Sequence, residues 1–198
     1  MSTQGLGLRE RKSARMRDAI ERAAAELTLE QGFANTTVDQ IAARADVAPR
    51  TVFARYPTKD AIIFSDALAT EDLLRAWIDN PERDLLDGMS DFVHGFFSAD
   101  PDRIDVKRLR VKAMLHDPYL RSVLHSRLGD IETRITTRVA NELHLAPDDA
   151  GPRVIAAAFS GLFLTMIETI TTNPDKFDPL SDCAHGIAVI RAGLDALR

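Results

Sequence analysis

The side chains with the clearest chemistry stand together on one short predicted helix. Arg50 and Arg55 carry guanidinium groups and Thr51 carries a hydroxyl, so this helix offers hydrogen-bond donors suited to base edges and phosphate oxygens. Val52 and Tyr56 are four residues apart and form the apolar, inward side of the same helix. A helix of this length with a polar and basic outer face fits the major groove of DNA.

Two short helices and a tight polar turn position these side chains. The first is predicted from about 38 to 44, where Thr36 is expected to cap the helix and Asp39 completes a capping box. The second is predicted from about 49 to 56 and begins at Pro49, whose missing N–H group costs nothing in a first turn. Together they predict a helix-turn-helix.

The rest of the chain alternates amphipathic stretches with Gly, Pro, Asn and Asp breaks, and no stretch has a convincing strand pattern. The other predicted helices cover about 9–31, 59–78, 83–98, 104–116, 118–143, 152–172 and 180–197. The sequence therefore predicts an all-α fold of about nine helices. A three-helix headpiece at the N-terminus is followed by a larger helical part.

The stretch from 154 to 167 carries no charged residue. It is too short to span a membrane, which takes roughly 20 apolar residues, so we expect a helix buried on nearly all sides. Small residues recur on this helix and on the last one, and they let helices approach closely. Apolar, small-residue faces of this kind suit a homodimer formed through the last two helices.

Charge is unevenly distributed along the 198 residues, whose formal net charge is −5. Residues 1–60 hold 10 Lys and Arg against 8 Asp and Glu, so the basic charge gathers beside the predicted helix-turn-helix. Local charge governs attraction to phosphate, and nucleic acid is therefore not excluded by the acidic total. A single cysteine and the lack of an apolar leader predict a cytoplasmic protein that does not interact with membranes.

Several aromatic and Met side chains of the larger part recur at helical spacing. They can form an ordinary core or line a cavity for an apolar ligand, and both interpretations stay open. These candidate ligand-binding residues are Trp77, Phe92, Phe96, Met114, Phe159, Phe163 and Met166. Arg110 lies in a basic stretch from 107 to 112, which is either a solvated face or a rim that binds a phosphate or carboxylate group.

No constellation in the sequence supports catalysis. The five histidines are scattered and none stands at metal-ligand spacing from another His, Cys or acid. Cys183 sits just inside a predicted helix, and no phosphate-binding glycine loop or nucleophile motif is present. We therefore expect no enzyme activity, no metal and no cofactor.

The spacing of residues 32–59 resembles the DNA-binding region of TetR-family transcriptional regulators. The matching residues are Gly32, Phe33, Thr36, Thr37, Val38, Ile41, Ala42, Ala45, Val47, Pro49, Arg50, Thr51, Val52, Phe53, Arg55, Tyr56, Pro57 and Lys59. The resemblance implies a helix-turn-helix DNA-binding domain at 1–57 and a ligand-binding and dimerisation domain at 58–198. It also implies a homodimeric, ligand-released repressor of a palindromic operator.

Roles at the DNA follow from this resemblance. Arg50 and Thr51 would contact base edges, and Phe53 would meet a thymine methyl group or a sugar. The expected phosphate contacts are Thr37, Arg55 and Lys59. The early basic residues, Arg9 and Lys12 among them, would lie beside phosphates, lead an arm toward the minor groove, or form an ordinary solvated face. Where the family often has Ser or Thr, this chain has Ala48, so its recognition helix lacks a side-chain cap.

The effector implied by the resemblance is an apolar or amphipathic small molecule. The segment HDPYLRSVL, followed by a long helix that carries arginines, is similar to members of the family that respond to fatty acyl thioesters. The alternative is a helical ligand-binding or assembly protein that does not bind DNA.

Overall fold

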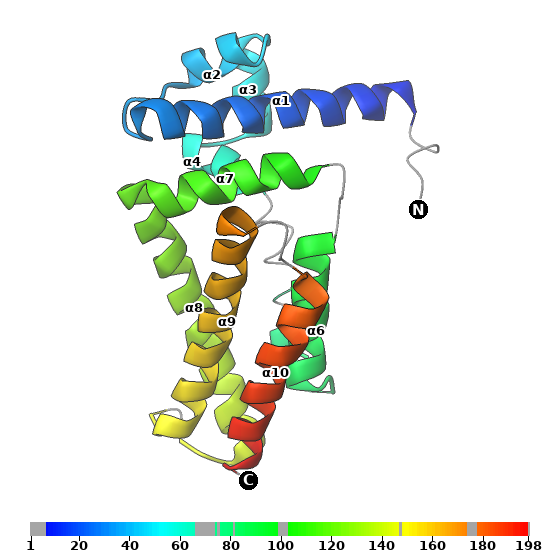
Figure 1. Ribbon diagram of the computed structural model, residues 1–198, viewed down its shortest axis with the longest axis vertical. Coiled ribbons are helices and arrows are strands. Elements are labelled where there is room, and N and C mark those ends of the chain that lie inside the picture. Colours follow the sequence, from blue (N-terminus) through cyan, green and yellow to red (C-terminus); the bar gives the residue numbers. More distant parts are fainter. Residues whose placement is uncertain are drawn as a thin grey trace. The chain divides into compact units, whose positions relative to one another are not determined.

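The computed structural model describes residues 7–65, 74, 76–80, 82–98, 103–146, 148–173 and 178–197. All regular elements among them are helices, and the nine described helices confirm the predicted all-α fold (Figure 1). The chain divides into two compact units. The first comprises Met1–Ser65 with Asp102–Arg121, and the second comprises Asp66–Pro101 with Ser122–Arg198.

The first unit is built on the long helix α1 (Leu8–Gln31). Helices α2 (Val38–Arg44), α4 (Lys59–Ile63) and α7 (Ile104–His116) each pack on α1, and α3 (Pro49–Arg55) packs on α2. Figure 1 shows α2 and α3 on one side of α1, with α4 and α7 on the other. The helix-turn-helix therefore shares one compact unit with α7, which begins at Ile104, far beyond the end of α3 at Arg55.

Small side chains let α7 approach α1 closely. The buried face of α1 includes Ala23, Ala24 and Ala25, and α7 buries Val106 and Val111. The apolar stripe of α1 was evident in the sequence, but nothing there indicated that α7 would join the N-terminal unit. The division of the chain by function at residue 57 stays a prediction.

The connection between α1 and α2 differs from the predicted one. Gly32 ends α1 with φ 82°, a conformation that L-residues rarely adopt. Thr37, not Thr36, is the N-cap of α2, and its side chain accepts a hydrogen bond from the Gln40 N–H. The expected capping box of Thr36 and Asp39 was therefore wrong by one residue. Thr36 is buried instead, and its hydroxyl donates to the Gly32 carbonyl at 3.0 Å.

The second unit contains α6 (Leu85–Ser98), α9 (Ala150–Thr172), α10 (Pro179–Asp195) and most of α8 (Pro118–Leu143). Helix α10 packs on both α6 and α9. Helix α8 buries one apolar stripe at helical spacing, in which five residues are buried and Ile131 is half-buried. The five buried residues are Leu120, Leu124, Leu128, Ile135 and Val139.

Arg138 of α8 organises the segment before α6. Its guanidinium group donates to the carbonyls of Ile78 at 3.1 Å, Asn80 at 2.7 Å and Arg83 at 2.6 Å. Carbonyls at the end of a helix need partners, and a buried arginine supplies several at once. The predicted continuous helix 59–78 was wrong at its first part, because α4 ends at Ile63 with Phe64 as its C-cap; residues 66–73 and 75 lie outside the described ones.

Helix α9 is less buried than predicted. Ile155, Phe159 and Ile170 are buried, but Val154 is 64% exposed and Ala157 also faces solvent. The expectation of burial on nearly all sides was therefore wrong for the single chain, because none of the described elements of this unit covers this face. By length and composition alone α9 could also cross a membrane, although 44% of its most apolar window is buried inside the protein.

Candidate nucleic-acid interface and effector core

The two faces of α3 are separated as the sequence predicts. Val52 and Tyr56 are 1% and 6% exposed and hold the helix in the core. Arg50 and Arg55 are exposed, and Phe53 is 60% exposed although its side chain is large and apolar. This outer face presents two guanidinium groups and an aromatic ring, which suits contacts with bases, sugars and phosphates.

The turn between α2 and α3 fixes the direction in which α3 leaves. Asp46 adopts φ 54°, a left-handed conformation that Asp tolerates better than most residues. The Val47 N–H donates to the Ala42 carbonyl at 3.0 Å and closes the turn. As expected from Ala48, the N-terminus of α3 has no side-chain cap. The packing of Val52 and the anchoring of the other end must therefore hold this seven-residue helix.

Thr37 and Lys59 both have structural partners within the first unit. Thr37 is exposed and caps α2. The Lys59 amine donates to the carbonyls of Phe33 at 2.6 Å and Thr36 at 2.7 Å, and it lies 4.1 Å from the centre of the Phe33 ring. Partial burial lowers the pKa of Lys59. In the free protein Lys59 therefore supports the loop between α1 and α2, and its contact with phosphate stays a prediction.

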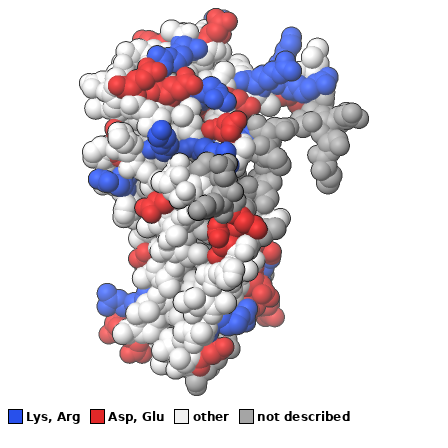
Figure 2. All heavy atoms as spheres, in the orientation of Figure 1, with Lys and Arg blue, Asp and Glu red and all other residues white. Residues whose placement is uncertain are grey.

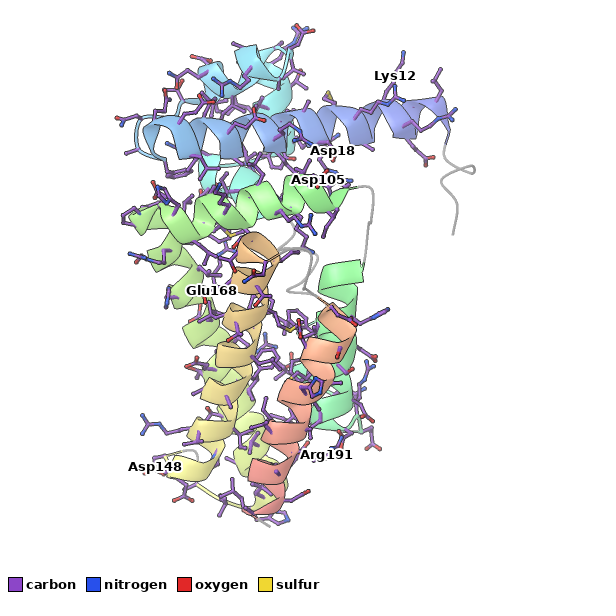
Figure 3. The ribbon with its side chains drawn as sticks, viewed as in Figure 1. Lys12, Asp18, Asp105, Asp148, Glu168 and Arg191 are labelled. Atoms are coloured by element: carbon purple, nitrogen blue, oxygen red, sulfur yellow. The ribbon has the colours of Figure 1, made fainter. Side chains whose placement is uncertain are left out.

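The N-terminal part of α1 is a basic arm. Arg9 and Lys12 are exposed, and Figure 2 shows Lys and Arg side chains gathered there. Lys12 points into solvent, away from α7 (Figure 3). Arg55 donates to the Ser13 hydroxyl at 2.7 Å, which ties the end of α3 to this arm. The basic arm and α3 both carry exposed positive charge, and the hydrogen bond between Arg55 and Ser13 connects them.

A buried charge cluster was missed at the sequence level. Glu21 is fully buried, and its carboxylate accepts from the Arg110 Nη1 and the Tyr56 hydroxyl, each at 2.9 Å. Arg103 donates to the same carboxylate and to Asp18, the latter at 2.6 Å. Figure 3 shows Asp18 on the side of α1 that faces α7. Burial and the neighbouring Glu21 raise the pKa of Tyr56, so its hydroxyl stays protonated and donates.

The signal that could have found the cluster is the position of Glu21 in the chain. It follows Ile20 and precedes, with Arg22 between, a run of three alanines, and it lies on the inward side of α1. A carboxylate there is costly unless it is paired. Arg110, for which the sequence left open a solvated face or the rim of an effector site, is 2% exposed and bound to Glu21.

Four of the predicted effector residues come together in the second unit. The Trp77 ring centre lies 6.3 Å from that of Phe92 and 5.3 Å from that of Phe159, and Phe92 lies 5.8 Å from Phe163. Met166 of the same unit is 1% exposed. The Trp77 indole N–H donates to the Leu85 carbonyl at 2.8 Å. This aromatic cluster is an apolar, rigid core.

Two other predicted effector residues lie in the other compact unit. Met114 and Arg110 belong to the first unit. The Phe96 side chain lies outside the described residues. Within the described ranges no group of His, Cys, Asp and Glu could hold a metal ion. Cys183 is buried, and burial raises the pKa of its thiol, which disfavours the reactive thiolate.

Two family models match the chain in succession. The tetR family of bacterial regulatory proteins matches residues 20–65, which contain α2 and α3. The MftR C-terminal domain matches residues 83–195, which is more than half of the chain.

Relatives and solved structures agree with these models. The HTH-type transcriptional regulator TcmR of Streptomyces glaucescens is 32% identical over 80% of this chain and 74% of its own. The putative mycofactocin biosynthesis transcriptional regulator MftR of Mycobacterium tuberculosis is 29% identical over 90% of each chain.

Two solved structures share the fold. A SmeT–triclosan complex has a TM-score of 0.62 at 21% identity, covering 89% of this chain and 90% of its own; SmeT is the repressor of a Stenotrophomonas maltophilia efflux pump. Thermus thermophilus FadR with lauroyl-CoA has a TM-score of 0.55 at 22% identity, covering 89% and 94%. By its family models and its relatives, the chain belongs to the tetR family of bacterial regulatory proteins and is a DNA-binding transcriptional regulator.

Proposed function

We propose that the chain is a ligand-released repressor that binds a palindromic operator as a cytoplasmic homodimer. The observation that carries the proposal is the outer face of α3, where Arg50, Phe53 and Arg55 are exposed while Val52 and Tyr56 lock the helix into the core. Bidentate arginine contacts with guanine are the commonest specific base contacts, so Arg50 is assigned to a guanine edge. Arg55, Arg9 and Lys12 are assigned to phosphates.

The DNA interface is tested with an Arg50→Ala/Arg55→Ala variant. We expect its affinity for a random-sequence duplex to fall by about tenfold at low salt, and the slope of log affinity against log salt to decrease by about one to two. Fluorescence anisotropy across a salt series measures both quantities.

A matched control removes two positive charges elsewhere. Lys112 is exposed on α7, and Arg83 makes an exposed ion pair with Asp91, so Lys112→Ala/Arg83→Ala is expected to bind as the wild type does. If the Arg50→Ala/Arg55→Ala variant binds DNA with the same affinity as the wild type, α3 is not the recognition helix.

The homodimer is proposed to form through α9 and α10. Val154 and Val189 are 64% and 73% exposed, and Ala157, Ala188 and Ala192 are exposed beside them. Figure 2 shows mostly uncharged surface over these two helices. Exposed apolar faces with small residues suit a self-complementary helix interface. Two copies of α3 related by a twofold axis would then reach half-sites about one turn, roughly 34 Å, apart.

A Val189→Asp variant is expected to dissociate the dimer, because two like charges would face each other across a twofold interface. Sedimentation velocity should give the monomer mass for Val189→Asp and the dimer mass for the wild type. Ser126→Asp adds the same charge to an exposed position of α8 and should leave the dimer intact. A wild-type protein that sediments as a monomer at micromolar concentration would rule out this interface.

The effector is proposed to bind within the second unit beside the aromatic cluster of Trp77, Phe92, Phe159 and Phe163. Apolar and aromatic linings suit apolar ligands, and proteins of this fold have been solved with triclosan and lauroyl-CoA. Residues 59–78 connect the helix-turn-helix to this unit. An effector that binds more tightly to a conformation with displaced DNA-binding headpieces would lower the affinity for DNA. The factor cannot exceed the ratio of the effector's affinities for the two conformations.

Thermal unfolding tests the effector with triclosan, lauroyl-CoA and lauric acid as probes. A bound probe at about ten times its Kd stabilises the fold by about 1.4 kcal/mol, which should raise the Tm by roughly 3–6 °C. The emission of Trp77, the only tryptophan, should change in the same titration. Unchanged Tm and emission with all three probes would contradict an apolar effector beside this cluster.

A further inference from the structure

The DNA interface described above uses none of the charged side chains buried in the first unit. Glu21 has no exposed surface, and the Arg110 side chain is 3% exposed. Arg103 is 13% exposed and bridges Glu21 to Asp18. Two cations and two carboxylates thus meet where α1 packs on α7. Replacing such a cluster with apolar residues is often neutral or stabilising, so its presence calls for an explanation other than stability.

Tyr56 connects this cluster to α3. It is the C-cap of α3, and its N–H donates to the Val52 carbonyl at 2.9 Å. Its hydroxyl, at the other end of the residue, donates to the Glu21 carboxylate. A hydrogen bond to a charged acceptor is about twice as strong as a neutral one. The C-terminal end of α3 is therefore held from inside the protein.

We propose that Arg110 and Arg103 are positioning residues for DNA binding, which act through Glu21 on Tyr56. The two arginines fix the Glu21 carboxylate, the carboxylate fixes the Tyr56 hydroxyl, and Tyr56 fixes the end of α3. The proposal rests on the proposed function, in which α3 is the recognition helix that contacts the bases.

The properties of α3 make such an anchor necessary. A helix of seven residues is unstable alone, and α3 has no side-chain cap at Ala48. If its C-terminal end were released, the helix would fray and would have to be ordered again at the DNA. That ordering would weaken binding, since the conformational entropy is lost on association.

The proposal also makes the DNA-binding machinery discontinuous in sequence. Arg103 and Arg110 lie within the stretch matched by the C-terminal family model, 38 residues or more beyond the end of the N-terminal match at residue 65. Both nevertheless belong to the compact unit that contains α3. A change in α7 would therefore reach α3 through one carboxylate.

A double-mutant cycle in the full-length protein tests the proposal. Tyr56→Phe keeps the ring and removes the hydroxyl, and Arg110→Met keeps the stem and removes the charge. Each change alone is expected to weaken binding to a random-sequence duplex by about tenfold. The double variant should be little weaker than either single one, since both act through the same carboxylate.

Two further readouts separate positioning from general loss of structure. Amide hydrogen exchange of α3 should become faster in Tyr56→Phe, while exchange of α6 in the second unit should stay unchanged. Lys112→Met makes the same kind of change at an exposed position of α7 and should bind DNA as the wild type does. If Arg110→Met fails to fold, Arg103→Met takes its place in the cycle.

The outcomes distinguish this proposal from the function on which it rests. If the Arg50→Ala/Arg55→Ala variant binds DNA like the wild type, α3 is not the recognition helix, and both the DNA-binding role of α3 and the positioning role of the two arginines are wrong. If that variant loses binding while Tyr56→Phe and Arg110→Met bind normally, only the positioning role is wrong. Effects that multiply to about a hundredfold in the double variant would likewise overturn it, since independent changes add in free energy.

Discussion

Replacing Glu21 with alanine is expected to lower the free energy of unfolding of the first unit by about 3–5 kcal/mol. The substitution leaves the 2%-exposed Arg110 without its carboxylate and takes a partner from Arg103. It also leaves the buried Tyr56 hydroxyl without its acceptor. A buried cation that loses its counter-ion keeps the full desolvation penalty, which is why the expected cost far exceeds that of losing the Glu21 side chain contacts.

Urea unfolding followed by far-UV circular dichroism measures this loss. Trp77 lies in the second unit, so its fluorescence reports that unit separately, and the Glu21→Ala variant should shift the circular-dichroism transition more than the fluorescence transition. Glu30→Ala is the matched control on the same helix. Glu30 and Arg44 form an exposed ion pair at 2.6 Å, so its removal should leave stability nearly unchanged. A loss below about 1 kcal/mol in Glu21→Ala would mean that the cluster does not hold the unit together.

The local features of the recognition unit could be predicted from sequence because they depend on neighbours a few residues away. The spacing of Val52 and Tyr56 gave the buried side of α3, and both residues are buried. Ala48 predicted that the N-terminus of α3 has no side-chain cap, and it has none. The error at Thr36 has the same local origin. Two adjacent threonines can each cap a helix, and the choice of Thr37 rests on Gln40, whose side chain accepts from the Thr37 N–H at 2.8 Å.

The buried charge cluster could not be predicted because its members are distant in sequence. Glu21 and Arg110 are 89 residues apart, and only the packing of α7 on α1 brings them together. Four basic residues between 107 and 112 all looked suited to solvent or to an anionic ligand. Which of them turns inward depends on the helix that α7 meets, and periodicity within α7 does not contain that information. Arg110 turns inward, whereas Lys112 is exposed.

The misjudged burial of α9 has a different cause. An uncharged stretch such as 154–167 has the same sequence pattern whether its outer face packs against its own chain or against another chain. Phe159 and Phe163 lie in the core, while Val154 and Ala157 are uncovered. Composition gives the total apolar surface but not the partner that covers it.

Gly88→Ala is expected to lower the free energy of unfolding of the second unit by about 2–4 kcal/mol. A Cβ atom at Gly88 would lie 1.7 Å from Cδ1 and 2.1 Å from Nε1 of the Trp77 indole. The indole is rigid and 2% exposed, so it can yield only by leaving its place. It would then lose its hydrogen bond to the Leu85 carbonyl and its packing on Phe92 and Phe159.

The same substitution at Gly129 should have the opposite sign. Gly129 is an exposed residue inside α8, and a Cβ there would meet nothing within 4 Å. Alanine stabilises an exposed helix interior relative to glycine by about 0.5–1 kcal/mol. Urea unfolding followed by the emission of Trp77 measures both variants. In Gly88→Ala the native emission should also shift to longer wavelength, since the displaced indole meets water. Equal stability of the two variants would mean that close packing against Gly88 does not set the position of Trp77. The aromatic cluster would then not be a rigid, preformed core for the effector.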